Sequence, residues 1–253
     1  MMKLSRIPFL VSLALVLTFS QTGLAAENPP AFNWTGPYIG AHIGYGWGNA
    51  DTSFSPLPTA DQFNNLAPTK LSPGPSGVVG GLQAGYNYQL GCFLVGIEAD
   101  FSGSGMSGSQ TVSPIAQNNG APFSGALTAH QETNWFGTLR PRLGYTVMPT
   151  LLAYGTGGLA YGDVSYSANT DYRAGGGVFY PASFSKTRVG WTVGGGFEYA
   201  VSKNWTVKTE YLYMDLGSES AVANANIGMP PFQVGYSWKT TAQIINIGLN
   251  YKF

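Results

Sequence analysis

The chain is poor in charge. Only 9% of its 253 residues are Asp, Glu, Lys or Arg, and the formal net charge is zero, whereas about a quarter of an ordinary soluble protein is charged. So few charges form neither a basic surface for nucleic acid nor an acidic surface for cations. The composition therefore argues against an ordinary soluble domain and predicts no nucleic-acid partner.

Cysteine and histidine are scarce as well. A single cysteine, Cys92, excludes an internal disulfide, and we interpret it as a small residue in a turn. With only two histidines, His42 and His130, no Ser or Cys nucleophile can be placed beside a base. The GxSxG and HExxH motifs and Cys/His metal spacings are missing too. We therefore predict that the protein is no enzyme, with no catalytic residue, metal site or cofactor.

A run of roughly 20 apolar residues, as a transmembrane helix requires, is also missing. The longest apolar run, at residues 7–19, follows Lys3 and Arg6 and precedes small residues at 23–26. This arrangement predicts a cleaved secretory signal peptide over residues 1–26. Residues 27–34 would then be a short periplasmic segment, and any membrane residence of the mature chain must use strands.

What the chain does have is alternation. At its end Ile245, Ile247, Leu249, Tyr251 and Phe253 are separated by polar residues or glycine. A period of two is typical of a strand with different environments on its two faces. Eight such segments occur, at residues 38–48, 78–88, 93–101, 135–145, 151–164, 188–199, 205–213 and 245–253.

Apart from segment 151–164, in which the alternation is ambiguous, the charges in these segments keep to the polar face. They are Glu98, Asp100, Arg140, Arg142, Arg188, Glu198, Lys208, Glu210 and Lys252. Since Arg or Lys at a bilayer midplane costs about 2 to 4 kcal/mol, this segregation indicates lipid outside and a polar interior. We predict an all-β fold, an eight-stranded antiparallel up-and-down transmembrane β-barrel over residues 35–253, because closure leaves no strand edge unpaired in lipid.

Three local features refine the predicted barrel. Segment 151–164 changes parity, which predicts a bulge near Gly157 and Gly158. Pro141 has no N–H for the ladder and predicts a bulge or local break. The short turn at 202–204 predicts that Glu198 pairs with Lys208 across the ladder.

The interior of an eight-stranded barrel is just wide enough for side chains to fill. We therefore predict a polar network of ion pairs in the lumen rather than an open pore. Its predicted members are Glu98, Asp100, Arg140, Arg142, Glu198, Lys208 and Glu210. His42 has the same inward parity and is predicted to be a packed interior residue.

Short and long connections alternate along the chain. In outer-membrane barrels short turns are periplasmic and long loops extracellular, which predicts the cell outer membrane as location with both termini in the periplasm. Residues 49–77, 102–132, 165–187 and 217–236 are predicted as four long extracellular loops, with His130 at the end of one. They contain aromatic candidates for a binding surface: Phe54, Phe63, Phe123, Tyr172, Phe179, Tyr180 and Phe232.

Several short stretches resemble a known family. They are WTGPYIG at 34–40, WFGTLR at 135–140, GWTVGGGFEY at 190–199, EYLY at 210–213 and NYKF at 250–253. They are similar to stretches of the opacity-type surface antigens of alphaproteobacteria, small porin-family outer-membrane barrels of Gram-negative bacteria with OmpA-like transmembrane architecture. The resemblance implies a surface antigen that stabilises the envelope. Pro141 departs from it, because the family pattern favours glycine there.

The resemblance also implies partners. They are outer-membrane lipid, an outer-membrane insertion machinery that reads Tyr251 and Phe253 as an assembly signal, and a host or extracellular ligand at the loops. An alternative stays open: a narrow porin, or a barrel that binds or transports a small molecule such as haemin. For haem ligation the candidates are His42 and His130.

Overall fold

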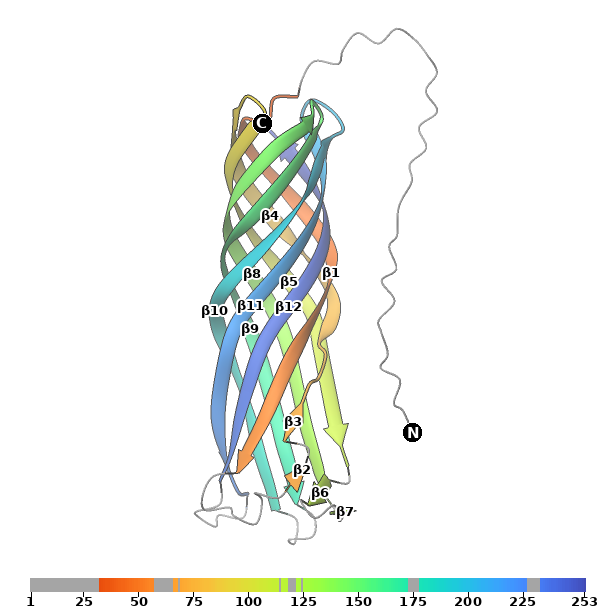
Figure 1. Cartoon of the computed structure of the whole chain (residues 1–253), viewed down its shortest axis with the longest axis vertical. Helices are drawn as coiled ribbons and strands as arrows, with labels where there is room; N and C mark the ends of the chain where they lie inside the picture. The colour runs from red at the N-terminus through yellow and green to blue at the C-terminus, as the bar shows by residue number, and fades with distance from the viewer. Residues whose placement is uncertain are drawn as a thin grey trace, which may run out of the picture. The chain divides into compact units, whose positions relative to one another are not determined.

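The fold is a closed β-barrel. The computed structural model describes residues 32–56, 66–67, 69–113, 115–117, 122–123, 125–172, 178–226 and 233–253, so the predicted signal peptide lies outside the described residues. The long strands are β1 (Gly36–Pro56), β4 (Ser76–Leu90), β5 (Phe93–Val112), β8 (Ala126–Met148), β9 (Leu151–Tyr172), β10 (Val178–Ala200), β11 (Trp205–Asn224) and β12 (Gln233–Lys252). Each pairs antiparallel with its neighbours in sequence, and β12 pairs with β1 (Figure 1). The predicted eight-stranded up-and-down barrel is confirmed.

Short strands and turns distinguish the two ends of the barrel. Residues 91–92, 149–150 and 201–204 connect strands at the end that also holds the carboxy terminus, which we call the turn end (Figure 1). The short strands β2 (Leu66–Ala67), β3 (Lys70–Leu71), β6 (Ile115–Gln117) and β7 (Pro122–Phe123) lie at the opposite end, the loop end. β3 pairs with β1, and β2, β6 and β7 form a small sheet of their own. The described residues include no helix that is long and apolar enough to cross a membrane.

An apolar belt surrounds the part of the barrel nearer the turn end. Its outward side chains are strongly exposed, as Leu82 at 69% and Leu143 at 68% illustrate. Outward aromatic residues gather towards both of its edges: Tyr88, Phe93, Tyr145, Tyr199, Trp205 and Tyr251 near the turn end, and Tyr45, Phe101, Trp135, Tyr161, Trp191 and Tyr213 on the other side. Aromatic girdles of this kind border the lipid-facing band of outer-membrane barrels.

The strands continue well beyond the belt, which corrects the predicted loops. Residues 49–77, 102–132, 165–187 and 217–236 were predicted as loops, but most of their described residues belong to strands. The long strands are connected at the loop end through residues 57–75, 113–125, 173–177 and 225–232. His130, predicted in a loop, lies on β8 and pairs with Ser109 and Ser167.

The reason is that the apolar face of the strands reverses beyond the belt. On β12 the residues Ile245, Ile247 and Leu249 point outward, whereas Tyr236 and Trp238 further along the same strand point inward and are buried. The outer wall there has exposed polar residues such as Lys239, because it meets water instead of lipid. The pattern of outward apolar residues therefore ends at the edge of the belt, although the strands continue beyond it.

Register settles the local predictions. Glu198 pairs with Lys208 as predicted. The bulge predicted near Gly157 and Gly158 is wrong, because β9 keeps one register with β10 from Leu151 to Tyr172. The alternation of β9 does not change direction along the strand. The sequence pattern looked broken because two large residues near the turn end, Leu152 and Tyr154, are buried inside the barrel.

Pro141 interrupts pairing without shifting it. On β8 the pairing with β9 is interrupted between Leu139 and Arg142, yet Leu139 pairs with Leu159 and Arg142 with Thr156, which is the same register. The predicted local break is therefore present, whereas the register shifts of this pair of strands lie elsewhere, between Thr133 and Trp135 and between Thr146 and Met148.

Candidate functional site

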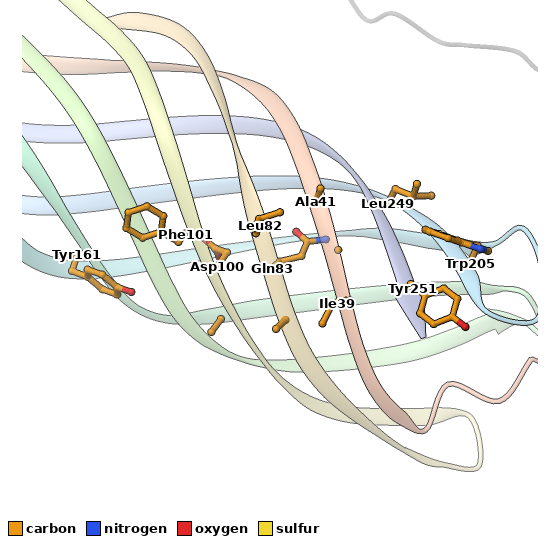
Figure 2. Close-up of a pocket in the computed structure, with 13 residues that line it drawn as sticks. Ile39, Ala41, Leu82, Gln83, Asp100, Phe101, Tyr161, Trp205, Leu249 and Tyr251 are labelled. Carbon is orange, nitrogen blue, oxygen red and sulfur yellow. The ribbon is translucent and has the colours of Figure 1, made fainter. Parts of the chain in front are cut away.

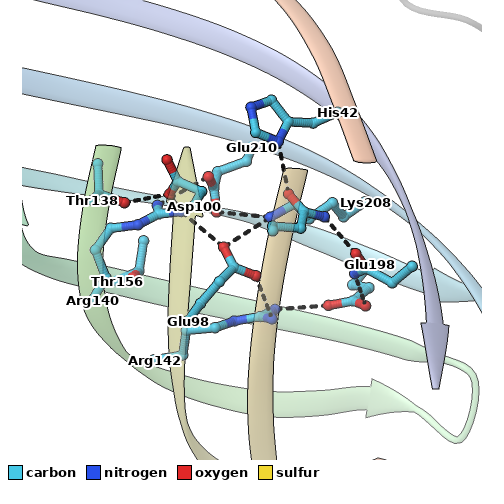
Figure 3. Close-up of polar contacts among 12 residues, drawn as sticks. His42, Glu98, Asp100, Thr138, Arg140, Arg142, Thr156, Glu198, Lys208 and Glu210 are labelled. Carbon is cyan, nitrogen blue, oxygen red and sulfur yellow. Dashed lines mark hydrogen bonds and ion pairs between the residues drawn. The ribbon is translucent and has the colours of Figure 1, made fainter. Parts of the chain in front are cut away.

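The barrel interior that the belt surrounds contains a continuous network of charged side chains. Arg140 donates from Nη2 to Glu98 Oε1 at 2.8 Å and to Asp100 Oδ2 at 2.9 Å, and from Nη1 to Glu210 Oε2 at 3.0 Å. Lys208 Nζ reaches the same Glu98 oxygen at 2.9 Å. The structure thus brings together residues of three strands, β5, β8 and β11, around Glu98 (Figure 3).

A second arginine extends the network to β10. Arg142 donates from Nη2 to Glu198 Oε2 at 2.7 Å and from Nη1 to Glu98 Oε2 at 3.3 Å. All seven residues predicted for the lumen network take part in these contacts: Glu98, Asp100, Arg140, Arg142, Glu198, Lys208 and Glu210. Each is at most 7% exposed.

Two tyrosines complete the network, and the sequence reasoning missed both. Tyr38 donates its hydroxyl proton to Glu98 Oε2 at 2.6 Å and accepts from Arg142 at 2.7 Å. Tyr154 donates to Glu210 Oε1 at 2.9 Å, and its ring lies 3.9 Å from the Arg142 guanidinium carbon. The inward parity of Tyr38, shared with His42, was the available signal.

Charge is nearly balanced in this network. It contains four carboxylates and three cations, so its formal charge is minus one, and every carboxylate has a cation within 3.3 Å. Buried charges need partners of this kind, because each ion loses its hydration shell. The arrangement therefore fills this part of the barrel interior and connects β5, β8, β10 and β11 through side-chain contacts.

His42 belongs to the packed interior, as its parity predicts. Its Nδ1 lies 3.0 Å from Gln83 Oε1 and its Nε2 2.8 Å from Ser102 Oγ, and the residue is 8% exposed. Gln83 in turn donates to Asn250 Oδ1. Both ring nitrogens are thus engaged by side chains, which leaves no nitrogen for haem iron.

A layer of aromatic side chains lies inside the barrel at the loop end. We call Tyr166, Tyr180, Phe184, Tyr236 and Trp238 the loop-end aromatic cluster. Trp238 lies 5.5 Å from Tyr166, 5.3 Å from Phe184 and 5.7 Å from Tyr236 between ring centroids. Burial raises the pKa of Tyr236 to about 12.

This cluster corrects the list of aromatic residues predicted to be exposed in loops. Tyr180 is 1% exposed inside the barrel, and Phe54 is partly buried with its ring 5.3 Å from that of Tyr236. Phe63 and Phe232 lie outside the described residues, as do the side chains of Phe123 and Tyr172. Phe179 is described on β10 and is partly buried.

The segment before β1 packs into the turn end. Phe32 and Trp34 form one buried apolar cluster with the inward residues Leu94, Leu152, Tyr154 and Ala200. The Trp34 backbone N–H donates to Gln89 Oε1 at 3.0 Å. The interior is therefore occupied at three levels, by this cluster, the charged network and the loop-end aromatic cluster.

The carboxy-terminal aromatic residues lie on the outside of the turn end. Tyr251 packs edge-on against Trp205 and Phe253, with centroid distances of 5.1 and 5.2 Å. Phe253 is 62% exposed, and its backbone N–H donates to Pro37 O at 3.2 Å, next to the closure of β12 on β1.

An outward hollow lies within the apolar belt. It has a volume of about 770 Å³, and most of its lining residues come from β1, β4, β5 and β12, among them Ala41, Leu82, Phe101 and Leu249 (Figure 2). Its walls are almost entirely apolar, so it offers contact to hydrocarbon and no group for chemistry.

Possible metal ligands and reactive side chains also occur outside the charged network. The described part of the chain contains no group of three or more His, Cys, Asp or Glu side chains that could hold a metal ion. Cys92 is exposed in the turn between β4 and β5.

Comparison with known proteins agrees with this architecture. The family described as outer membrane protein beta-barrel domain matches residues 11–253. The 31 kDa outer-membrane immunogenic protein of Brucella melitensis is 40% identical over 88% of this chain and 85% of its own. The 22 kDa outer membrane protein of Rhizobium leguminosarum bv. viciae is 31% identical over 90% of this chain and 83% of its own.

A solved structure supports the fold. The crystal structure of the outer membrane protein OprG from Pseudomonas aeruginosa has a TM-score of 0.51 at 15% identity and covers 87% of this chain and 97% of its own. With a family match over most of the chain and relatives that are outer-membrane immunogenic proteins, this protein belongs to the outer-membrane β-barrel family.

Proposed function

We propose that this protein is a surface antigen that stabilises the bacterial outer membrane and meets host or extracellular ligands at its loop end. In this orientation both termini lie in the periplasm, and the short turns face the periplasm too. The proposal rests on one observation: the barrel continues beyond the belt, and its interior is filled by side chains. Its partners would be outer-membrane lipid at the belt and a ligand at the loop end.

Strand length sets how far the loop end lies from the membrane. β10 continues from the belt residue Trp191 to Val178, which at about 3.3 Å per residue is roughly 40 Å of strand path. The loop-end termini of the long strands are therefore held away from the lipid, where a partner in the medium can reach them.

Trimming the connections tests this proposal. Residues 57–69, 114–124, 173–177 and 227–232 are replaced by short Gly/Ser turns, which keeps β3 and all long strands. We expect a barrel that still migrates differently on SDS gels with and without boiling, because the ladder remains closed, but that loses antibody or ligand binding on whole cells. Recognition that survives loss of all four connections would place the functional surface elsewhere.

Assembly is expected to depend on the last residue. Phe253→Ser removes the terminal aromatic side chain that, with Tyr251, is proposed as the signal for the insertion machinery. Surface levels in cells should fall severalfold, whereas refolding into detergent should change little because Phe253 is exposed. Val222→Ser, an exposed apolar residue at the loop end, serves as the control. Equal surface levels of Phe253→Ser and the unchanged protein would argue against the signal.

The alternative of a narrow porin makes a different prediction for conductance. Because Arg140, Glu98 and Trp238 occupy the lumen at two levels, each at most 1% exposed, we expect no stable channel when the refolded protein is placed in a planar bilayer. Steady openings of uniform size would instead favour transport, and the filled lumen would then have to rearrange.

A further inference from the structure

The barrel wall contains a stretch where two neighbouring strands are not paired. Pairing between β10 and β11 runs from Ala200 with Thr206 to Trp191 with Asp215 and ends there. β10 nevertheless stays paired with β9 as far as Val178, and β11 stays paired with β12 as far as Asn224. We call the space between β10 residues 180–190 and β11 residues 216–225 the seam.

The seam closes again at its far end. The backbone N–H of Phe179 donates to Asn226 Oδ1 at 2.8 Å, and the backbone N–H of Asn226 donates to Phe179 O at 2.9 Å. The two strands separate because β11 shifts register between Asp215 and Ser218, where Gly217 has a φ of 77°. Beyond this point β11 follows β12 while β10 follows β9.

Charged side chains bridge the seam in place of a ladder. Arg188 on β10 donates from Nε to Leu216 O at 3.3 Å and from Nη2 to Ser218 O at 2.5 Å. Arg188 also forms an ion pair with Glu219 on β11, and Lys186 reaches the same carboxylate at 3.0 Å. Inward charges on strand edges discourage pairing with another strand, so the seam is poorly suited to strand addition.

Partly exposed apolar side chains lie on both strands of the seam. Ala182 and Phe184 on β10 and Ala221 on β11 are only partly buried, and all three pack against the buried apolar residues of the loop end. Phe184 lies 5.3 Å from Trp238 between ring centroids. A ligand in the seam would therefore meet apolar surface on its way to the loop-end aromatic cluster.

Charge at the seam favours one class of ligand. Two cations, Lys186 and Arg188, share the single carboxylate of Glu219, so these three groups have a formal charge of plus one. An anionic head group can accept hydrogen bonds from Arg188 and Lys186 while an attached chain covers Phe184, Ala182 and Ala221. We propose that the seam binds a single-chain anionic amphiphile, of the fatty-acid type, taken up from the aqueous phase.

Tryptophan quenching tests the proposal on the full protein refolded in vesicles. The probe is dodecanoate with bromine on its chain, and the signal is the difference between the protein and Trp238→Phe, which isolates the tryptophan beside Phe184. We expect saturable quenching of Trp238. The brominated dodecanol, which has the same chain without charge, should bind about tenfold more weakly, the equivalent of one charge-assisted hydrogen bond.

Variants separate the head-group contacts from the chain contacts. Lys186→Gln with Arg188→Gln should weaken dodecanoate binding about tenfold and leave dodecanol binding unchanged, while Ala221→Phe should weaken both. Lys203→Gln, which removes an exposed cation of the turn end, is the matched control and should change neither. Each variant is first checked for its heat shift on gels.

Three results would overturn the proposal. They are the absence of a saturable Trp238 signal, equal affinity for the carboxylate and the alcohol, and quenching that arises only from brominated phospholipid of the vesicle. The last result would make bilayer lipid the occupant of the seam.

Discussion

Replacing Glu98 with alanine is expected to lower the free energy of unfolding by about 3 to 5 kcal/mol. Glu98 accepts from Arg140, Arg142, Lys208 and Tyr38 at distances of 2.6 to 3.3 Å. Its removal would leave three buried cations with three carboxylates and would leave Lys208 with Glu210 at 3.8 Å as its remaining ion pair. The network would then be formally neutral, so the loss does not come from net charge. It is large because three buried cations would lose the acceptor that they share, not because a buried pair is strongly stabilising in itself.

Denaturant unfolding in detergent, followed by tryptophan fluorescence, measures this loss. Asp51→Ala is the matched control, since Asp51 pairs with Lys70 at 2.8 Å but the two side chains are 35% and 54% exposed. An exposed pair contributes at most about 1 kcal/mol. If both substitutions had the same small effect, the charged network would not hold the strands together.

Trp238→Ala is expected to destabilise the barrel by about 3 to 5 kcal/mol, the usual effect of truncating a buried aromatic residue. Trp238 is fully buried at the loop end between Tyr166, Phe184 and Tyr236. The sequence gives no hint of this, because the neighbouring residues were predicted to form a polar loop.

Trp191→Ala provides the comparison. Trp191 lies on the outer face at the edge of the belt and is 50% exposed, so its truncation in detergent should cost less than about 1.5 kcal/mol. The ratio of the two losses, measured by the same unfolding experiment, checks whether the loop end is a packed core. Equal losses would mean that the loop end contributes little to stability.

The belt and the charged network could be predicted because lipid constrains one face of each strand. Charged residues such as Glu98 and Arg140 cannot face hydrocarbon, so parity alone assigns them to the interior. The register of β10 and β11 was equally accessible, since a short turn connects Ala200 to Trp205 and fixes the pairing of Glu198 with Lys208.

The loop end could not be predicted by the same reasoning. Beyond Trp191 and Tyr213 the outer face of the wall no longer meets lipid, so its residues need not be apolar. Small polar residues there, such as Ser183 and Ser185, resemble loop residues. Tyr154 could not be assigned to either face for a related reason. Its ring suits a lipid-facing position, whereas its hydroxyl has a buried partner in Glu210, which pattern alone cannot reveal.

The reversal of polarity at Trp191 and Tyr213 fixes the depth of the barrel in the bilayer. Sliding the loop end towards the bilayer would carry outward residues such as Lys239 and Asp163 into hydrocarbon, at about 2 to 4 kcal/mol for a lysine near the midplane. Sliding the barrel in the opposite direction would expose the apolar residues of the belt to water. Height above the membrane is therefore a fixed property of this protein, so that any receptor or antibody must reach the same plane on every copy.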